Sequence, residues 1–247
     1  MKVLLFFFFL TVHSVSHALI NGDAVVTDIP IVRLTFKNDS HVCSGVFIDP
    51  YTILTAAHCV SDKQTWEGFS LEIDSILDSR ENKIEVRQIK NIPHPEYQNH
   101  WYGNSHDLGI IKTTEYSFKG SFPEIMKAED KLSNEGNLYG CGKINLDSKL
   151  RKCLKGKNSF HSLFGQFITW GKSKNTDRLG FDVSVAPNDS GGPLVEISQN
   201  KIVGVAWGTH LSFTSKLGLP NISFITPLTN MQNLEFINKN MGTLVEK

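Results

Sequence analysis

Residues 53–59 read ILTAAHC, a short apolar run that ends at a histidine followed by a cysteine. The apolar and β-branched residues over 52–57 predict a strand that carries His58 at its end. Imidazole titrates near neutral pH, so a histidine held at the end of a strand is a candidate general base. A single histidine of this kind is often a packing residue, and its chemical meaning depends on the partners found elsewhere in the chain.

Two further segments supply such partners. Residues 105–112 read SHDLGIIK, in which Asp107 leads directly into an apolar strand, and residues 187–193 read PNDSGGP, in which Ser190 lies in a glycine turn. A serine hydroxyl becomes nucleophilic when an adjacent base takes its proton, and a buried carboxylate orients that base and stabilises its charged form. The three segments together therefore predict nucleophilic catalysis by Ser190, His58 and Asp107.

In this order and these contexts, the three segments resemble the trypsin/chymotrypsin family of serine proteases. HPEY at residues 94–97 and GVAWG at residues 204–208 are similar to further segments of that family, and the resemblance runs through nearly the whole chain after residue 18. It implies an all-β fold of two six-stranded antiparallel barrels with a C-terminal helix. The implied activity is that of a serine endopeptidase, which hydrolyses polypeptides through an acyl-enzyme and needs no cofactor.

The resemblance also assigns the residues around the nucleophile. The backbone N–H groups of Asn188 and Ser190 stand at the oxyanion-hole positions, although the family usually has glycine where this chain has Asn188. Asparagine keeps its N–H and tolerates unusual backbone angles, so the oxyanion hole is expected to survive in a weaker form. Leu19 stands where the family has its new N-terminus, with Asp189 as the ion partner of the freed amine.

Substrate specificity is left open between two alternatives. By the same resemblance Ala206, Trp207 and Gly208 bind the substrate backbone, and Ser184 lies at the base of the pocket for the residue before the cleaved bond. A serine there favours large apolar residues at this substrate position. If Asp182 pointed into the pocket instead, lysine or arginine would be preferred.

The first 18 residues differ in character from the rest of the chain. Lys2 precedes an apolar run over residues 3–10, and small residues follow at Ser16 and Ala18. This pattern predicts a signal peptide over residues 1–18, shorter than the roughly 20 apolar residues that a membrane span needs. We therefore expect a secreted or periplasmic protein of residues 19–247 that leaves the membrane after cleavage. Because Ala18 replaces the family's basic activation residue, signal peptidase itself is expected to create the Leu19 terminus.

The chain has four cysteines, an even number that suggests two disulfides in an oxidising compartment. Their spacing alone leaves all three possible pairings open. The family resemblance implies a bridge between Cys43 and Cys59 beside the histidine, which leaves Cys141 and Cys153 as the second pair. No C-x-x-C pair is present, and no metal site is predicted; Asp74, Asp78 and Glu81 are interpreted as solvated surface carboxylates rather than a calcium site.

Short strands separated by turn residues are predicted along the rest of the chain, as in a β-sandwich or barrel. The predicted strands cover residues 31–36, 42–48, 52–57, 84–89, 108–113, 137–140, 167–170, 194–197, 202–207 and 222–225. A C-terminal helix is predicted over residues 228–240, with Leu228, Met231, Leu234 and Ile237 on one face. The join between the two halves is placed near residues 115–130.

Composition restricts the classes of partner. Lys and Arg together number 25, as do Asp and Glu, so the formal net charge is zero. A nucleic-acid-binding protein usually carries a basic excess, and we expect a monomer that binds no nucleic acid. The rival interpretation is a protease-like binding protein that has lost activity, for which the asparagine at position 188 is the support.

Overall fold

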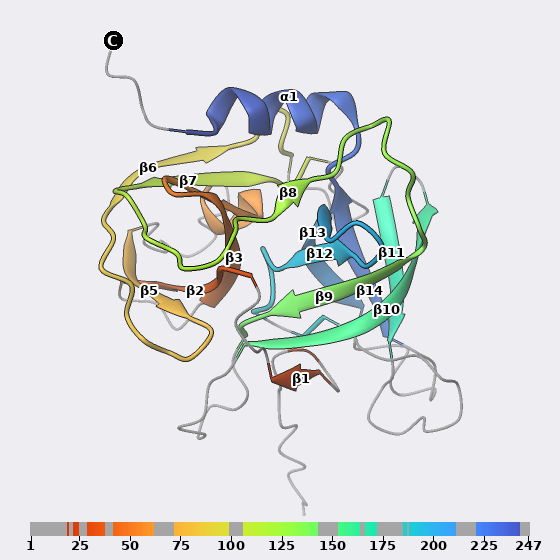
Figure 1. Ribbon diagram of the computed structural model, residues 1–247, viewed down its shortest axis with the longest axis horizontal. Helices are drawn as coiled ribbons and strands as arrows, with labels where there is room; N and C mark the ends of the chain where they lie inside the picture. The colour runs from red at the N-terminus through yellow and green to blue at the C-terminus, as the bar shows by residue number, and fades with distance from the viewer. Residues whose placement is uncertain are drawn as a thin grey trace, which may run out of the picture.

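The structure of this protein is a computed structural model, shown in Figure 1. The residues that it describes are 19, 22–24, 29–37, 42–61, 72–98, 106–142, 153–163, 166–171, 185–186, 188–210 and 221–242. The predicted signal peptide at residues 1–18 lies outside them, as do Asp182 and Ser184.

The N-terminal half forms a six-stranded antiparallel sheet with the order β5-β2-β3-β4-β7-β6. Its strands are β2 (Ile31–Phe36), β3 (Val42–Asp49), β4 (Thr52–Thr55), β5 (Ile73–Asp78), β6 (Gln88–Pro93) and β7 (Gly109–Thr113). The side chain of Gln88 accepts a hydrogen bond from the Ile73 N–H at 3.0 Å, which links β6 to β5. The sheet is therefore barrel-like, with β4 and β7 side by side within it.

The C-terminal half forms the second sheet, in which β9 pairs with both β10 and β12, so that six strands close a ring. These strands are β9 (Glu135–Gly140), β10 (Leu154–Leu163), β11 (Gln166–Gly171), β12 (Pro193–Glu196), β13 (Lys201–His210) and β14 (Asn221–Pro227). Two short strands, β1 (Asp23–Ala24) and β8 (Glu124–Ile125), pair with β10 and β13. The predicted fold of two antiparallel barrels is confirmed.

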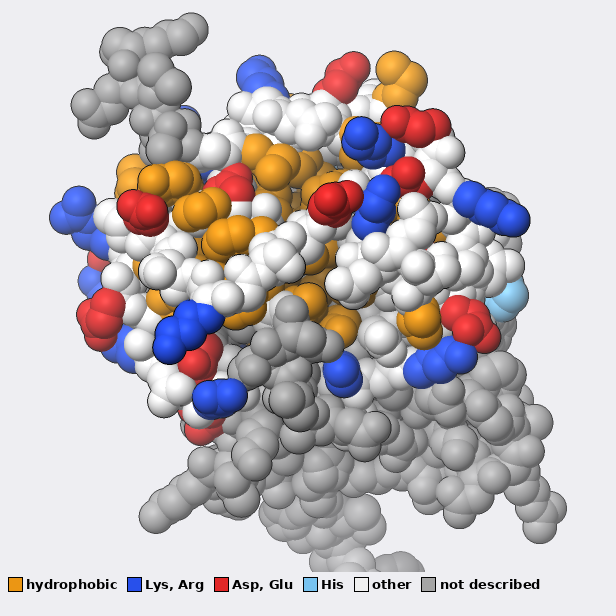
Figure 2. Space-filling view, in the orientation of Figure 1, with side chains coloured by type: hydrophobic (Ala, Val, Ile, Leu, Met, Phe, Trp, Pro, Cys, Tyr) orange, Lys and Arg blue, Asp and Glu red, His pale blue; other side chains and the backbone are white. Residues whose placement is uncertain are grey.

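The helix α1 (Met231–Asn240) follows the second barrel in the chain but packs on the first, as Figure 1 shows. Its residues Phe236 and Ile237 belong to the same buried cluster as the strands of the first barrel. The segment between β7 and β8 crosses between the two barrels and carries Tyr116, Phe118 and Phe122, whose rings form successive contacts. Figure 2 shows hydrophobic side chains gathered on the face that this segment crosses.

The predicted strand over residues 84–89 is wrong in its position. The strand in this region is β6, which begins at Gln88, whereas Ile84 is joined to Ile76 of β5 by a single backbone hydrogen bond of 2.8 Å. Ile84 and Val86 alternate with polar residues, but Arg87 and Gln88 both separate Val86 from Ile89. In the structure Ile89 is 52% exposed, so the alternation does not mark one buried face there.

The predicted C-terminal helix begins too early, and its apolar face is only partly buried: Leu228 and Ile237 are buried, whereas Met231 is exposed. Asn230 caps the helix through its side-chain oxygen, which accepts the Asn233 N–H, so the helix begins at Met231 rather than at Leu228. Met231 is 72% exposed, and the buried helix residues are Asn233, Phe236 and Ile237. The buried face therefore includes a polar residue, Asn233, that the apolar pattern does not include.

Candidate active site

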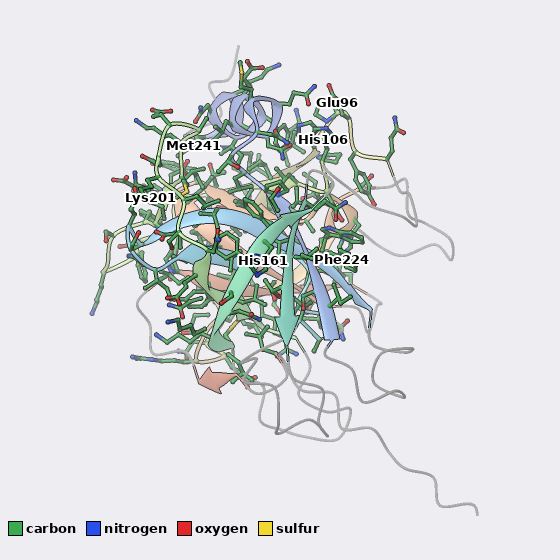
Figure 3. The ribbon with its side chains drawn as sticks, turned by 90° about the vertical axis from the view of Figure 1, so that its right-hand side faces the viewer. Glu96, His106, His161, Lys201, Phe224 and Met241 are labelled. Atoms are coloured by element: carbon green, nitrogen blue, oxygen red, sulfur yellow. A yellow bond between two sulfur atoms is a disulfide. The ribbon has the colours of Figure 1, made fainter. Side chains whose placement is uncertain are left out.

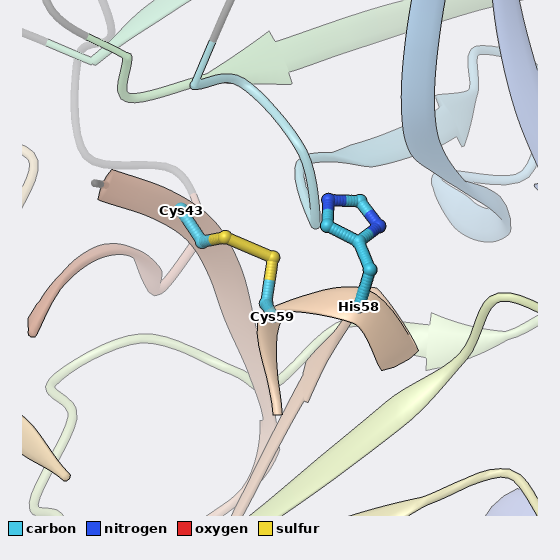
Figure 4. Close-up of side chains that lie close together, drawn as sticks. All are labelled: Cys43, His58 and Cys59. Atoms are coloured by element: carbon cyan, nitrogen blue, oxygen red, sulfur yellow. A yellow bond between two sulfur atoms is a disulfide. The ribbon is translucent and has the colours of Figure 1, made fainter. Parts of the chain in front are cut away.

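The sequence around His58 folds as a strand followed by a single helical turn. Strand β4 ends at Thr55, and the 3-10 turn Ala57–Cys59 then directs His58 out of the first barrel. Cys59 forms a disulfide with Cys43 of β3, with an S–S distance of 2.04 Å, as Figure 4 shows. This bridge fixes the turn that carries the histidine against the neighbouring strand.

His58 is held by Asp107, which precedes β7. The ring Nδ1 of His58 lies 2.7 Å from Oδ2 of Asp107, and the His58 backbone N–H donates to Oδ1 at 2.9 Å. Strand β7 lies beside β4 in the sheet, which brings together residues 49 positions apart. Burial of the ring works to lower the pKa of His58, but the charge and hydrogen bond of Asp107 outweigh burial and raise it above its ordinary value.

Ser190 lies in a turn that is hydrogen-bonded to both barrels. Its carbonyl oxygen accepts the N–H of Ser44 on β3 at 2.7 Å and lies 3.9 Å from Cys59 Sγ, next in sequence to His58. From the second barrel, the Ala206 carbonyl accepts the Gly191 N–H at 2.7 Å. The Ser190 hydroxyl lies 3.5 Å from the Trp207 carbonyl oxygen. The serine turn and the histidine turn therefore meet at the junction of the barrels.

Glycine is required next to the serine because the backbone is tightly enclosed there. Gly191 has a φ of +89°, a backbone conformation that residues with a side chain rarely adopt. A Cβ at this position would lie 2.0 Å from the Ser44 carbonyl oxygen and 2.2 Å from Thr55 Oγ1. The close approach of strand β3 to the serine turn therefore depends on this glycine.

Asn188 also adopts the left-handed conformation, with a φ of +75°. Asparagine is one of the few residues with a side chain that tolerates this region, which accounts for its presence where the resemblance predicts glycine. The neighbouring Asp189 is fully buried and accepts N–H groups from Ala186 at 2.8 Å and Gly142 at 2.9 Å. These contacts fix the backbone on both sides of Asn188.

Asp189 also contacts Leu19, the residue whose freed amine is the ion partner that the resemblance implies. The Leu19 nitrogen donates to Asp189 Oδ2 at 2.9 Å, and the Leu19 side chain is buried in the core of the second barrel. In this chain, which includes residues 1–18, that nitrogen is a peptide N–H, so the buried carboxylate has no counter-cation among these three donors. Burial raises the pKa of Asp189 to about 6, against the opposing effect of its backbone hydrogen bonds.

The predicted substrate-binding residues Ala206, Trp207 and Gly208 lie on β13, beside the serine turn. A register shift between Ala206 and Gly208 produces a bulge at Trp207, whose ring stacks on Phe224 at 5.1 Å. The predicted pocket base, Ser184, lies outside the described residues. Its neighbour Val185 is buried and donates its N–H to the hydroxyl of Ser223 on β14 at 2.9 Å.

Sequence reasoning missed Ser44, which joins three parts of this region. Its N–H donates to the Ser190 carbonyl, its hydroxyl accepts the Cys141 N–H at 2.8 Å, and its carbonyl accepts the Thr55 hydroxyl at 2.7 Å. A serine beside a half-cystine in an apolar strand was the available signal. It was too weak to read alone because nothing in the sequence places strand β3 against the turn at Ser190.

One group of potential metal ligands comes together among the described residues, namely Cys43, His58 and Cys59, within 4.8 Å of one another. Both sulfurs are bonded to each other in the disulfide, so neither is a thiolate that binds a metal. Asp78 is one of the three carboxylates interpreted above as solvated rather than as a calcium site. Its carboxylate accepts the backbone N–H groups of Arg80 and Asn82, each at 2.8 Å.

The second disulfide joins Cys141 to Cys153, so both pairings implied by the resemblance are present. It links the end of β9 to the start of β10.

Among the helices of the described residues, none has the length and apolar character to span a membrane.

Comparisons with known proteins agree with this architecture. The sequence model of the family described as Trypsin matches residues 20–234. The chain is 27% identical over 218 residues to bovine proproteinase E, covering 81% of this chain and 84% of that protein. It is 28% identical over 197 residues to human chymotrypsin-like elastase family member 3B, covering 72% of this chain and 73% of that protein.

Two solved structures have the same fold. A Glu endopeptidase in complex with MPD superposes with a TM-score of 0.65 at 18% identity, over 90% of this chain and 96% of that one. Mouse neuropsin, a serine protease, superposes with a TM-score of 0.61 at 18% identity, over 90% of this chain and 99% of that one. With the family match spanning both barrels, the chain belongs to the trypsin family of serine proteases.

Proposed function

We propose that this protein is a secreted serine endopeptidase whose catalytic triad is His58, Asp107 and Ser190. The observation that carries the proposal is the buried pair of His58 Nδ1 and Asp107 Oδ2 at 2.7 Å, beside the turn that holds Ser190. Asp107 accepts from Nδ1, so the neutral ring has its acceptor lone pair on Nε2. Nε2 then takes the hydroxyl proton of Ser190 as Oγ attacks the peptide carbonyl carbon.

The backbone N–H groups of Asn188 and Ser190 stabilise the oxyanion that forms in this attack. The left-handed backbone of Asn188, with φ of +75°, supports this role because it is the region that glycine, the family's usual residue here, adopts readily. Each donor of this kind contributes about 2.7–4 kcal/mol to transition-state stabilisation. The imidazolium of His58 returns its proton to the leaving amine, which gives the acyl-enzyme, and water then hydrolyses the ester.

Cleavage after Ala18 completes the active conformation in this proposal. It turns the Leu19 nitrogen, already 2.9 Å from Asp189 Oδ2, into an ammonium that supplies the missing counter-cation. Signal peptidase makes this cut directly, so export and activation are a single step. The two disulfides suit the same export route, because disulfides persist in oxidising compartments.

The substrate is a polypeptide, and the residue before the cleaved bond is large and apolar. The described residues nearest to the proposed pocket support this preference because they are uncharged and buried. Val185, Ala206 and Ser223 are each at most 1% exposed. The alternative, a basic residue held by Asp182, is the second outcome of the test below.

The test is cleavage of a peptide library by protein that begins at Leu19, with products sequenced by mass spectrometry. We expect cleavage after Phe, Tyr, Leu or Met that is abolished in Ser190→Ala. Cleavage after Lys or Arg would reject the apolar pocket but keep the triad. Absence of Ser190-dependent cleavage, in folded protein with both disulfides formed, would reject the enzyme in favour of a binding protein.

A further inference from the structure

The backbone around Asp107 is held by its two neighbours in sequence. The Leu108 N–H donates to the His106 carbonyl at 2.8 Å, and the Leu108 carbonyl accepts the His94 N–H at 2.8 Å. Asp107 is therefore the middle residue of a tight turn whose following residue is fixed. The Asp107 carboxylate contacts His58 through both oxygens, and the residue on the other side of this turn is His106.

His106 is held at both ring nitrogens. Nδ1 lies 2.9 Å from Asn233 Oδ1 on α1, and Nε2 lies 3.4 Å from a carboxylate oxygen of Glu96. Figure 3 shows His106 and Glu96 close together beside α1. The side-chain nitrogen of Asn233 donates to the Pro227 carbonyl at 2.6 Å, which fixes the amide so that its oxygen faces the ring. Both ring nitrogens of His106 therefore face acceptors.

An acceptor at each nitrogen selects one protonation state of the ring. Neutral imidazole has one N–H and one lone pair, so it satisfies one of these two contacts and opposes the other. The imidazolium donates to Asn233 and places its positive charge beside the Glu96 carboxylate, whose nearer oxygen is 3.4 Å from Nε2. Gln232 of α1 donates to the other oxygen of Glu96 at 3.2 Å, which holds the carboxylate in place.

The ring packed against His106 is that of His94, at 4.7 Å between centroids and 15° between planes. His94 Nδ1 accepts the Glu96 N–H at 3.2 Å, so this nitrogen carries no proton. Burial lowers the pKa of His94, and the neighbouring His106 lowers it further. The neutral ring of His94 is thus stacked on the ring of His106, which faces two acceptors.

We propose that His106 is a positioning residue for Asp107, held as an imidazolium between Asn233 of α1 and the carboxylate of Glu96. The titratable groups around it are His94 and Glu96 from the segment after β6, and the adjacent Asp107. From α1 the contacting group is the neutral Asn233, and Glu235 and Lys239 lie farther along the groove beside His94. Through this bridge, a helix that packs on the first barrel fixes the orientation of the catalytic carboxylate. This inference rests on the proposed triad.

Its first test is spectroscopic and independent of catalysis. Protein that begins at Leu19, labelled with ¹⁵N-histidine, is observed by NMR at about pH 7.5, where an ordinary exposed histidine is mostly neutral. The ring signals of His106 are assigned by their loss in His106→Leu. We expect protons on both ring nitrogens, and loss of the Nε2 proton signal in Glu96→Gln. A ring with a single proton in the parent protein would overturn the proposal.

The second test is kinetic. We expect His106→Leu and Asn233→Leu each to lower kcat by roughly tenfold with KM near the parent value, because Asp107 is misplaced while substrate contacts remain. The double variant should lose no more than either single variant, since both break one bridge. Glu235→Gln, which removes an exposed carboxylate from the same helix, is the matched control and should keep the parent kcat.

If His106→Leu is folded, as verified by urea unfolding, and keeps the kcat of the parent protein, the inference is overturned. It is also overturned if the losses in kcat of the two single variants add in the double variant. If the parent protein itself shows no Ser190-dependent hydrolysis, the proposed function fails, while the NMR result still decides the protonation state of His106.

Discussion

Individual residues at this site combine ordinary chemistry with unusual backbone conformations. Asn188 is the clearest case, because its φ of +75° suits glycine better than any residue with a side chain. The conformation is stabilised from both sides by the contacts of Asp189 with Ala186 and Gly142. Asn188 therefore takes a backbone conformation that glycine, which the resemblance predicts here, adopts readily.

Substitution of Asn188 tests this interpretation. Asn188→Gly should keep or raise kcat, because glycine adopts the same backbone without strain. Asn188→Ala should lower stability by about 1 kcal/mol and also lower kcat, because alanine resists the left-handed region. Asn200, with a φ of +55° in an exposed turn, is the matched control: Asn200→Ala should lose similar stability and keep the parent kcat. Equal kcat for Asn188→Ala and Asn200→Ala would contradict the role of Asn188.

The pair of Asp107 and His58 predicts a particular pH profile. General-base catalysis needs neutral His58, so kcat/KM should rise with pH through the pKa of His58, which Asp107 holds above its ordinary value. Asp107→Asn should shift this rise in kcat/KM to lower pH, and it should lower kcat by about 10⁴-fold near pH 7. Stopped assays over a pH series measure both effects. An unshifted rise in Asp107→Asn would contradict the assignment.

At the residue scale, the sequence predicted contacts that depend on motif chemistry better than contacts that depend on packing. The pairing of His58 with Asp107 and that of Leu19 with Asp189 follow from the family resemblance, and the structure has both contacts. The role of Ser44 was not predictable, because it arises where the two barrels meet. The protonation state inferred for His106 likewise depends on acceptors from two separate segments.

At the scale of elements, strand prediction succeeded where apolar residues are continuous and failed where polar residues interrupt them. The buried strands β2 and β3 were predicted nearly to the residue, whereas β5 and β10 were missed. Helix α1 was predicted, but it begins later than expected, and Met231 of its predicted apolar face is exposed. Its buried Asn233 is a contact to His106, and a hydrophobic pattern does not reveal a buried polar contact.

The C-terminal end of α1 is held by a buried lysine. Lys112 of β7 donates to Thr52 Oγ1 at 2.7 Å, to the Asn240 carbonyl at 2.9 Å and to the Gly242 carbonyl. These carbonyls are among the groups at a helix end that lack partners within the helix. Burial lowers the pKa of Lys112, against the opposing charge of Asp49. The lysine thus connects the helix to the first barrel.

Replacement of this lysine should loosen the helix. Lys112→Met leaves buried carbonyls without a donor, so the free energy of unfolding should fall by about 1–3 kcal/mol and the amides of α1 should exchange faster. Lys239→Met, on an exposed position of the last turn, should change stability by less than about 0.5 kcal/mol. Urea unfolding and hydrogen exchange measure these effects. Equal stability of the two variants would contradict the role of Lys112.

At the scale of the whole molecule, the N-terminal segment reaches the buried carboxylate of Asp189 through the Leu19 N–H, 2.9 Å from Oδ2. With Leu19 joined to a preceding residue, the folded pKa of Asp189 is about 6, above the ordinary value of about 3.9. A raised acid pKa means that the folded state binds the proton more tightly. Stability is therefore lost as pH rises between these two values, by about 3 kcal/mol at neutral pH.

Protein that begins at Leu19 should escape this loss, because its ammonium pairs with the ionised Asp189. We expect it to be more stable at pH 7 than the same protein with one added glycine before Leu19, with the difference narrowing below pH about 5. The extended protein should also lose most of its activity. Urea unfolding at both pH values measures the difference. Equal stability at pH 7 would contradict the ion pair.

In the proposed mechanism, His58 removes the proton of Ser190 so that this oxygen becomes a nucleophile. The most direct measurement of this step is the mass of protein that begins at Leu19 after reaction with a fluorophosphonate. We expect one adduct, located on Ser190, absent in Ser190→Ala and formed far more slowly in His58→Ala. No adduct on folded protein, or equally fast labelling without His58, would contradict the mechanism.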